Sequence, residues 1–290
     1  MALFRFALGF GAVNAAGVQG PAVFEQMSDV ARAGEAAGFD AVFVPDHVWQ
    51  NDRGGTGRDA PMLEAYTLLG ALAARTSTIR LGSLVTAVTF RNPAVLAKTV
   101  TSLDVISHGR AILGLGAAWD KEEHEGYGID FPSTGERMDR LEEALQICRA
   151  MFVDEAPTFA GSHYAIAGAL NVPRPVAGQI PILVGGGGEK RTLALVAHYA
   201  DACNVFGGPD VVAHKLEVLR AHCDAIGRDV GEITKTAGVQ PGASTAELCR
   251  SVASLFDIGV DGVIVAGNFP SAHDVENVGT ALIKEFGPTG

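Results

Sequence analysis

The hydrophobic positions of this chain fall into two patterns that alternate along its length. Short continuous apolar runs, each ended by glycine, proline or a polar residue, predict buried strands, and stretches with apolar residues three and four apart predict helices. Phe4–Phe10 and Pro21–Gly38 form the first such pair. The other predicted pairs are Ala41–Val44 with Leu63–Thr76, Ile79–Val88 with Pro93–His108, Ala111–Leu115 with Glu136–Phe152, Ile182–Val184 with Glu189–Tyr199, Ala202–Phe206 with Val211–Ile226, Ile233–Val239 with Ala246–Ile258, and Gly262–Val265 with Ala272–Phe286.

Eight strand–helix units in this order predict an α/β protein with a closed (β/α)8 barrel, a TIM barrel. The strands are continuously apolar rather than alternating, which is typical of parallel strands that are covered on both sides. Helix starts carry expected capping residues at Asn92, Ser133, Ser244 and Ser271. An open, doubly wound sheet is the alternative, because the pattern does not show closure. We expect residues 1–290 to form one domain.

Three connections are longer than a barrel needs. Asp46–Pro61 follows the second strand and Trp119–Thr134 follows the fourth, and both are polar and contain glycine. The carboxyl ends of barrel strands carry the chemistry in such folds, so these extended loops are expected beside a site. An insertion at Asp154–Pro181, between the fourth helix and the fifth strand, predicts a short hairpin or cover.

Composition and charge exclude several classes of protein. The chain has 290 residues, of which 48% are hydrophobic and 19% charged, so it is not disordered. A formal net charge of −11 disfavours nucleic acid and anionic membranes as partners. No apolar run reaches the roughly 18 residues that a membrane span requires. The four cysteines form no C-x-x-C pair, which indicates reduced core residues in a cytoplasmic protein.

Met1–Ala16 has a second interpretation as a secretory signal, because it is largely apolar and small residues follow. Arg5 interrupts the apolar stretch and little basic sequence precedes it. We therefore expect a first buried strand here.

The most informative segment joins the fifth strand to its helix. Gly185, Gly186, Gly187 and Gly188 follow the strand, and Glu189, Lys190 and Arg191 open the predicted helix. Cations at a helix N-terminus oppose the helix dipole, so a negative group is expected there. Amides of clustered glycines can surround phosphate oxygens. The alternative is a flexible turn with two solvated cations; the pattern matches neither the dinucleotide fingerprint nor a P-loop.

Asp46 and His47 directly follow the second strand. Histidine exchanges a proton near neutral pH, and an adjacent carboxylate can hold its charge or its tautomer. Alternatively, the aspartate caps a turn and the histidine is hydrogen-bonded in the loop. Trp49 is either an apolar wall beside them or packing beneath the loop.

Small residues at two further strand ends leave room for a planar ligand. Leu84, Val85 and Thr86 lie in the long third strand, and Gly116, Ala117 and Ala118 precede Trp119 at the end of the fourth. Ordinary strand structure and close packing of a strand on a helix explain the same residues. The run Asp120–Glu125 holds a histidine among carboxylates, but no second histidine stands at ligand spacing, so we expect no metal and interpret it as a solvated helical turn. No G-x-S-x-G nucleophile motif is present.

Four segments together resemble the bacterial luciferase-like superfamily, and within it the oxidoreductases that use the deazaflavin coenzyme F420. They are Arg80–Pro93, Ile106–Trp119, Gly185–Leu193 and Tyr199–Asn204. The likeness is collinear over nearly the whole chain. It implies a (β/α)8 barrel that binds F420 or FMN at the carboxyl ends of its strands.

The resemblance also implies roles for particular residues. Asp46 and His47 would lie near the ring, with His47 as proton donor or acceptor. A non-prolyl cis peptide backing the deazaflavin would fall at Leu84–Val85, followed by Thr86. The four glycines with Lys190 and Arg191 match the phosphate-binding segment. The net charge of −11 disfavours the anionic F420 tail unless Arg53, Arg58, Lys190 or Arg191 line its path. Relatives of this kind are often dimers, so we expect a homodimer.

One departure from the pattern bears on the substrate. F420-dependent sugar-phosphate dehydrogenases of this superfamily carry a catalytic glutamate after the fourth-strand glycines, and Trp119 stands there in this sequence. We therefore expect an F420-dependent oxidoreductase with a more apolar pocket, which transfers a hydride to or from a small carbonyl, alcohol or activated alkene. The alternatives are an FMN-dependent monooxygenase and a non-catalytic flavin- or deazaflavin-binding protein.

Overall fold

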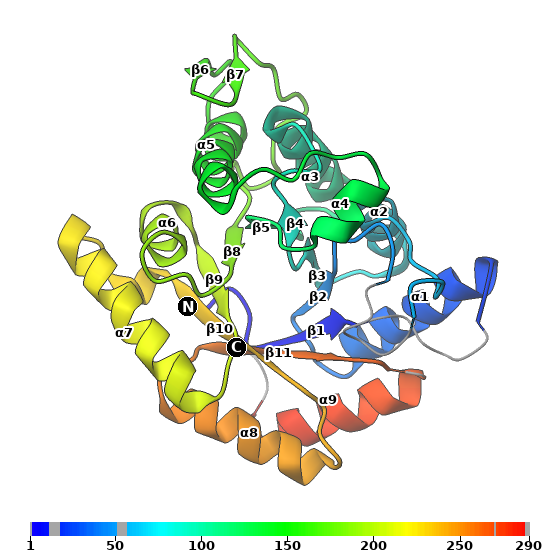
Figure 1. The fold of residues 1–290 in the computed structure, drawn as a ribbon. Helices are drawn as coiled ribbons and strands as arrows, with labels where there is room; N and C mark the ends of the chain where they lie inside the picture. Colours follow the sequence, from blue (N-terminus) through cyan, green and yellow to red (C-terminus); the bar gives the residue numbers. More distant parts are fainter. Residues whose placement is uncertain (1, 12–17, 51–56, 270, 288–290) are drawn as a thin grey trace.

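Eight parallel strands close into a barrel with a ring of helices around it (Figure 1). The computed structural model describes residues 2–11, 18–50, 57–269 and 271–287. The barrel strands are β1 (Phe6–Phe10), β2 (Ala41–Val44), β3 (Arg80–Ser83), β5 (Ala111–Gly116), β8 (Ile182–Gly185), β9 (Ala202–Val205), β10 (Thr234–Val239) and β11 (Gly262–Gly267). Pairing of Leu81 with Ala111 joins β3 to β5 and closes the ring. The predicted barrel is therefore confirmed, and the open sheet is wrong.

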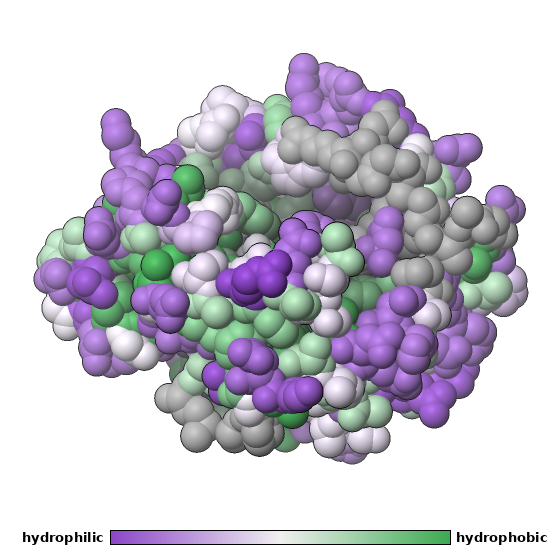
Figure 2. Space-filling view, turned by 90° about the horizontal axis from the view of Figure 1, so that it is seen from below, coloured by the Kyte–Doolittle hydropathy of each residue, from purple (hydrophilic) through white to green (hydrophobic). Residues whose placement is uncertain are grey.

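The helices follow their strands in the predicted order. They are α1 (Pro21–Ala36), α2 (Ala65–Arg75), α3 (Pro93–Ile106), α5 (Thr134–Val153), α6 (Thr192–Tyr199), α7 (Pro209–Ile226), α8 (Thr245–Asp257) and α9 (Ala272–Phe286). Asn92, Ser133 and Ser244 accept hydrogen bonds from amides of the first turn, as expected, and the Asp274 carboxylate accepts from the amide of Ser271. Hydrophilic residues are spread over the face seen in Figure 2, with smaller apolar areas between them.

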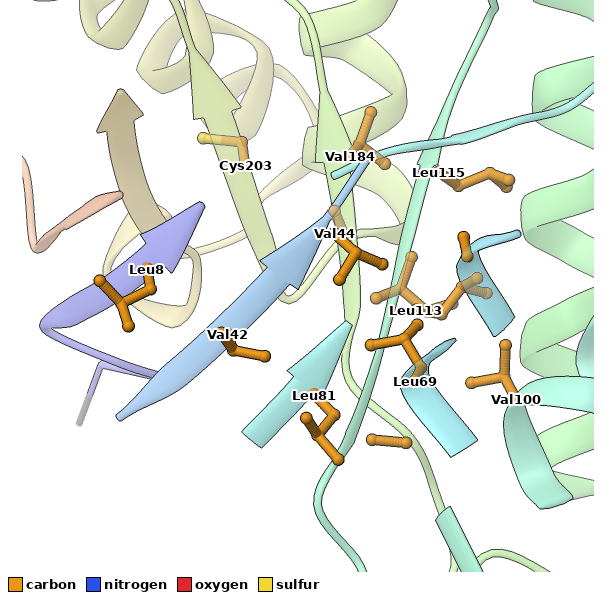
Figure 3. Packing of buried hydrophobic residues seen from close by; sticks show 14 of the residues in the cluster. Leu8, Val42, Val44, Leu69, Leu81, Val100, Leu113, Leu115, Val184 and Cys203 are labelled. Carbon is orange, nitrogen blue, oxygen red and sulfur yellow. The ribbon is translucent and has the colours of Figure 1, made fainter. Parts of the chain in front are cut away.

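Alternate strand residues pack into two separate cores, which explains why the strands are continuously apolar. Side chains such as Val42, Leu81 and Leu113 point outward to Leu69 of α2 and Val100 of α3 (Figure 3). The barrel interior is filled by the other set, which contains Phe4, Ala7, Ala41, Phe43, Ile112, Leu183, Ala202 and Ile264. The packed interior leaves the carboxyl ends of the strands as the place for a site.

The third strand is shorter than the sequence predicts. Instead of one strand over Ile79–Val88, the structure has β3 and a two-residue strand β4 (Thr86–Ala87). Between them lies a cis peptide bond that joins Leu84 to Val85, at the position where the resemblance predicts it. The hydropathy pattern cannot reveal this break, because the residues on both sides of it are apolar.

The long connections contain additional elements. The insertion between α5 and β8 holds the predicted hairpin, made by the antiparallel strands β6 (Phe159–Ala160) and β7 (Ala165–Ile166). Glu143 of α5 anchors the turn of this hairpin by accepting hydrogen bonds from three consecutive amides. The loop after β5 contains a short helix, α4 (Lys121–Gly126), within the run that the sequence predicts to be a helical turn.

The cysteines are expected to be reduced core residues, and three of the four lie in the core. Cys148, Cys203 and Cys223 are buried free thiols, whereas Cys249 is partly exposed.

None of the helices in the described ranges is both long and apolar enough to cross a bilayer. The predicted first strand is β1, which pairs with β2 and β11, and residues 12–17 lie outside the described part of the chain.

Candidate active site

A pocket of about 300 Å³ lies at the carboxyl ends of the barrel strands. It brings together residues from segments far apart in the sequence: Asp46, His47, Leu84, Val85, Ala87, Gly116, Ala117, Ala118, Trp119, Asp120, Glu123, His124, Gly185, Gly186, Thr192 and Phe206. Its size falls in the range of small-molecule sites. Most residues that the sequence singles out for a ring and for acid–base chemistry therefore line one cavity.

One wall of this pocket is made of residues without large side chains, packed around Val85. A Cβ atom built at Gly116 would come within 2.7 Å of Cγ2 of Val85, and one built at Gly185 within 2.8 Å of its Cγ1. Glycine is therefore required at both positions if Val85 is to keep its place. Thr86 is fully buried behind this wall and contacts the Tyr66 hydroxyl at 2.7 Å.

The turn after β5 is held in an uncommon backbone conformation. Ala118 has a φ of +62°, which residues other than glycine seldom adopt. The Arg137 side chain of α5 donates a hydrogen bond from Nε to the carbonyl oxygen of Ala117 at 2.9 Å. This contact fixes the small wall that Ala117 and Ala118 present to the pocket.

Asp46 is buried at the edge of the pocket and forms an ion pair with Arg91. The Arg91 guanidinium donates to both carboxylate oxygens, at 2.5 and 3.0 Å, and also pairs with Glu64. Burial raises the pKa of Asp46 above its ordinary value, although the hydrogen bonds and the charge of Arg91 act in the opposite direction. Asp46 thus faces the Arg91–Glu64 pair, and His47 contacts a different carboxylate.

That carboxylate belongs to Glu123 of α4. Nδ1 of His47 lies 2.8 Å from Oε2 of Glu123, whose side chain is only 1% exposed. Burial alone would lower the pKa of His47, but the Glu123 carboxylate, with Asp120 and Asp46 nearby, outweighs it, so the pKa of His47 is raised. The pair supplies a proton-exchanging group at the pocket.

The interpretation of Asp120–Glu125 as a solvated helical turn is right about the helix, which is α4. It is wrong about the solvation of Glu123 and His124, which are both 1% exposed. Glu123 contacts the loop after β2, and Nε2 of His124 lies 2.6 Å from the Thr89 hydroxyl. Sequence reasoning also missed Thr192 and Phe206, which line the pocket. No local signal marks Glu123 and His124 as buried, because their partners His47 and Thr89 are distant in the sequence.

Two exposed aromatic side chains border the pocket. Trp119 is 46% exposed and Phe206 is 62% exposed. The Trp119 ring meets the His47 ring edge-on, with centroids 5.4 Å apart. Trp49 does not line the pocket; its ring packs against Tyr127 instead, with centroids 5.7 Å apart. Of the two tryptophans that the sequence offers as walls, the structure brings Trp119 to the pocket.

The four glycines form a loop at one end of the pocket. Gly185 and Gly186 line it, and Gly186 has a φ of +125°. In the described chain, the amides of Gly187, Gly188 and Glu189 donate no hydrogen bond to a protein acceptor. Lys215 of α7 approaches from one side, since a Cβ at Gly187 would lie 3.6 Å from its Cε. The loop therefore offers free backbone donors, as the sequence predicts, and the neighbouring cation Lys215, which the sequence did not identify.

The sequence predicts Lys190 and Arg191 in the first turn of the helix. This prediction is wrong, because α6 begins only at Thr192. Arg191 turns to α5 and donates to Asp139 at 2.6 Å and to the Gly135 carbonyl at 3.1 Å. Lys190 is exposed. Glu189 is held by α7 through its side-chain contacts with Lys215 and His214. The residues between Gly186 and Thr192 do not line the pocket themselves.

Of the other two arginines expected along the cofactor tail, Arg53 lies outside the described residues. Arg58 pairs with Glu122 and covers the Trp49 ring at 5.5 Å from its centroid. Among the described residues, no lysine or arginine lines the pocket. Its ionisable groups are carboxylates and histidines, so the pocket is poorly suited to an anionic substrate group.

His47, Asp120 and Glu123 place one ligand atom each within 4.8 Å of one another. Both Glu123 oxygens already accept hydrogen bonds, Oε1 from the Val48 amide and Oε2 from His47. We therefore interpret this cluster as a hydrogen-bonded acid–base group.

A second and larger cavity, of about 500 Å³, lies at the amino ends of the strands and is lined among others by Arg5. This is the face of a barrel that does not carry catalysis.

Comparisons with known proteins give matches in both sequence and structure. The sequence matches the family model described as luciferase-like monooxygenase over residues 4–269. An F420-dependent glucose-6-phosphate dehydrogenase of Kineococcus radiotolerans is 34% identical over 220 residues, which cover 74% of this chain and 63% of that protein. A protein of the same name from Microbacterium testaceum is 32% identical over 206 residues, covering 70% and 59%. The aligned part is thus less than two thirds of the length of either relative.

Among solved structures, an F420-dependent secondary alcohol dehydrogenase in complex with an F420–acetone adduct superimposes with a TM-score of 0.82. The superposition covers 97% of this chain and 98% of that chain, at 17% sequence identity. This likeness shows that the two chains share a fold.

Proposed function

The chain belongs to the luciferase-like monooxygenase family, and from this premise we propose that it is an F420-dependent oxidoreductase that acts on a small uncharged carbonyl, alcohol or activated alkene. The observation that carries the proposal is the continuity of one pocket from the glycine wall around Val85 to His47. A flat ring against that wall would lie beside a group that exchanges protons. The names of the matched relatives support F420 as the cofactor.

The residues present fit the two parts of such a cofactor. Val85, Gly116 and Ala117 line the pocket, and their small side chains leave room for a planar ring. The free amides of Gly187, Gly188 and Glu189 are donors for phosphate oxygens, a role that clustered glycines next to a helix start commonly have. Lys215, and Lys190 at the exposed edge of the loop, are the nearest cations, and we assign Arg191 to holding the loop against α5.

When bound, F420 supplies a deazaflavin ring that exchanges a hydride with a substrate carbon. Nε2 of His47 takes the hydroxyl proton when an alcohol is oxidised and returns it to the oxygen when a carbonyl is reduced. Trp119 and Phe206 hold the apolar part of the substrate against the pocket. Asp46 and Arg91 keep the loop that carries His47 in place.

We assign an uncharged substrate from the charges of the pocket. Asp46, Asp120 and Glu123 line it, and among the described residues no lysine or arginine does. A phosphorylated sugar would place a dianion beside these carboxylates at a substantial electrostatic cost. A ketone, secondary alcohol or enone meets no such repulsion.

The test is a substrate screen under nitrogen. Oxidised F420 is mixed with secondary alcohols and with glucose 6-phosphate, and reduced F420 with ketones, enones and quinones, while the deazaflavin absorbance is followed. We expect turnover with one of the uncharged classes and none with glucose 6-phosphate. Turnover with the sugar phosphate alone would overturn the substrate assignment, and binding of F420 without any turnover would support the non-catalytic alternative.

An FMN-dependent monooxygenase is the second candidate because the family model is described as luciferase-like monooxygenase. Such an enzyme would consume oxygen with reduced FMN and an organic substrate. Oxygen uptake with reduced FMN, and none with reduced F420, would favour it.

A further inference from the structure

Both oxygens of the buried Glu123 carboxylate are committed to the loop that carries His47. Oε2 lies 2.8 Å from Nδ1 of His47, and Oε1 accepts from the amide of Val48 at 2.6 Å. The amide of Trp49 is a further donor to Oε1 at 3.4 Å. The Asp120 carboxylate in turn accepts from the amide of Glu123 at 3.2 Å and fixes the start of α4.

An ionised carboxylate can only accept hydrogen bonds, so the proton of a neutral His47 ring belongs on Nδ1. The lone pair then lies on Nε2. No described residue forms a hydrogen bond with Nε2, and His47 lines the pocket. Glu123 therefore selects the tautomer in which the nitrogen left for a substrate proton is the basic one.

From this geometry we propose that Glu123 is a positioning residue: it fixes the ring and tautomer of His47 and stabilises the imidazolium when Nε2 accepts a proton. The inference rests on the proposed function for the source of that proton, but the tautomer and the stabilised charge are properties of the protein without cofactor.

The packing of α4 against the loop explains how one carboxylate can hold the ring. A Cβ at Gly126 would come within 2.2 Å of Cη2 of Trp49, so glycine allows the helix and the loop to approach. The Tyr127 hydroxyl donates to the Val48 carbonyl at 3.1 Å. Glu123 thus acts within a rigid contact between two segments that are about 75 residues apart.

The carboxylates around His47 act in one direction. Glu123 of α4, Asp120 at the N-cap of α4 and Asp46 in the loop of His47 each raise the pKa of His47. The aromatic neighbour Trp119 is uncharged. Removal of the Glu123 charge leaves burial as the main influence, which disfavours the imidazolium.

The test uses Glu123→Gln, with Glu125→Gln as the matched control on the exposed side of the same helix, where Glu125 pairs only with Lys121 among the described residues. A glutamine side chain has an oxygen in place of one carboxylate oxygen and an NH₂ group in place of the other, so only one of the two positions that bind Val48 and Nδ1 keeps an acceptor. If the oxygen stays with Val48, its NH₂ group faces Nδ1 and favours the Nε2–H tautomer. Nitrogen NMR of ¹⁵N-histidine-labelled protein without cofactor reports both the tautomer and the titration of His47.

We expect the unaltered protein and Glu125→Gln to show the Nδ1–H tautomer, and Glu123→Gln to titrate at lower pH with a changed tautomer. In turnover, Glu123→Gln should lower kcat by about 10- to 100-fold, as loss of an orienting partner does elsewhere, with little change in KM. An Nε2–H tautomer in the unaltered protein, or an unchanged His47 titration in folded Glu123→Gln, would overturn the proposal. If Glu123→Gln does not fold, the tautomer of the unaltered protein still decides. Failure of the enzyme to bind F420 would remove the proposed function without altering these NMR results.

Discussion

Val85 occupies space that a Cβ atom at residue 116 would need, since that atom would come within 2.7 Å of its Cγ2. A Cβ atom built at Gly185 on the neighbouring strand would come within 2.8 Å of Cγ1 of Val85. Strands β5 and β8 therefore each contribute a glycine where the chain between β3 and β4 enters the pocket. The position of Val85, and with it the shape of the proposed ring site, depends on these two residues.

Gly116→Ala is expected to push Val85 into the pocket and to weaken F420 binding by at least about tenfold, equivalent to roughly 1.4 kcal/mol. Gly70→Ala in α2 is the control, because a Cβ there meets nothing within 4 Å and alanine favours a helix over glycine. Fluorescence titration of both variants with F420 measures the effect. Unchanged affinity in Gly116→Ala would show that the ring does not lie against Val85.

Arg91→Met should destabilise the protein by about 3–5 kcal/mol, because it leaves the buried Asp46 carboxylate without its partner. Arg75→Met removes an arginine from an exposed pair with Glu25, at 3.5 Å, and should cost less than about 1 kcal/mol. Urea unfolding followed by circular dichroism compares the two. Equal losses would contradict the assignment of Asp46 and Arg91 as a structural pair beneath His47.

The raised pKa of His47 predicts a pH dependence of stability. A histidine with a folded-state pKa above its ordinary value of 6.5 stabilises the protein fully below that value, and the contribution is lost as pH rises through the folded pKa. The free energy of unfolding of Glu123→Gln should therefore differ most from that of the unaltered protein at mildly acidic pH. Urea unfolding over a pH series measures this difference. A difference that grows with rising pH would have the wrong sign.

Phe206→Ala tests the apolar wall of the substrate site. Phe206 is 62% exposed beside the pocket, so a substrate can cover it and remove apolar surface from water. We expect KM for an apolar ketone or alcohol to rise by roughly tenfold, which corresponds to about 1.4 kcal/mol, with kcat nearly unchanged. Ile226→Ala, at the far end of α7, provides the control for loss of an exposed apolar side chain. A fall in kcat at constant KM would instead place Phe206 near the reacting atoms.

The sequence predicted the features that depend on neighbours in the chain. The eight strand–helix pairs follow from periodicity, and Asn92 caps its helix as its position before a proline indicates. Asp46, His47 and the small residues at Gly116–Ala118 were located because they end buried strands, and parallel strands in a barrel end on one face.

What the sequence did not predict depends on distant contacts. Glu123 stands in a charged hexapeptide that resembles a solvated turn, and only the loop after β2 makes its burial favourable. Lys190 and Arg191 would oppose the helix dipole only in a helix that begins at Glu189, but Glu189 is bound by Lys215 of α7 and the helix starts at Thr192. Such contacts have no local pattern.

Titration of the purified protein with F420 and FMN side by side, followed by absorbance and fluorescence, shows which cofactor the pocket binds. We expect saturable binding of F420 with a change in the deazaflavin spectrum, and much weaker binding of FMN. Tight binding of FMN without affinity for F420 would contradict this expectation.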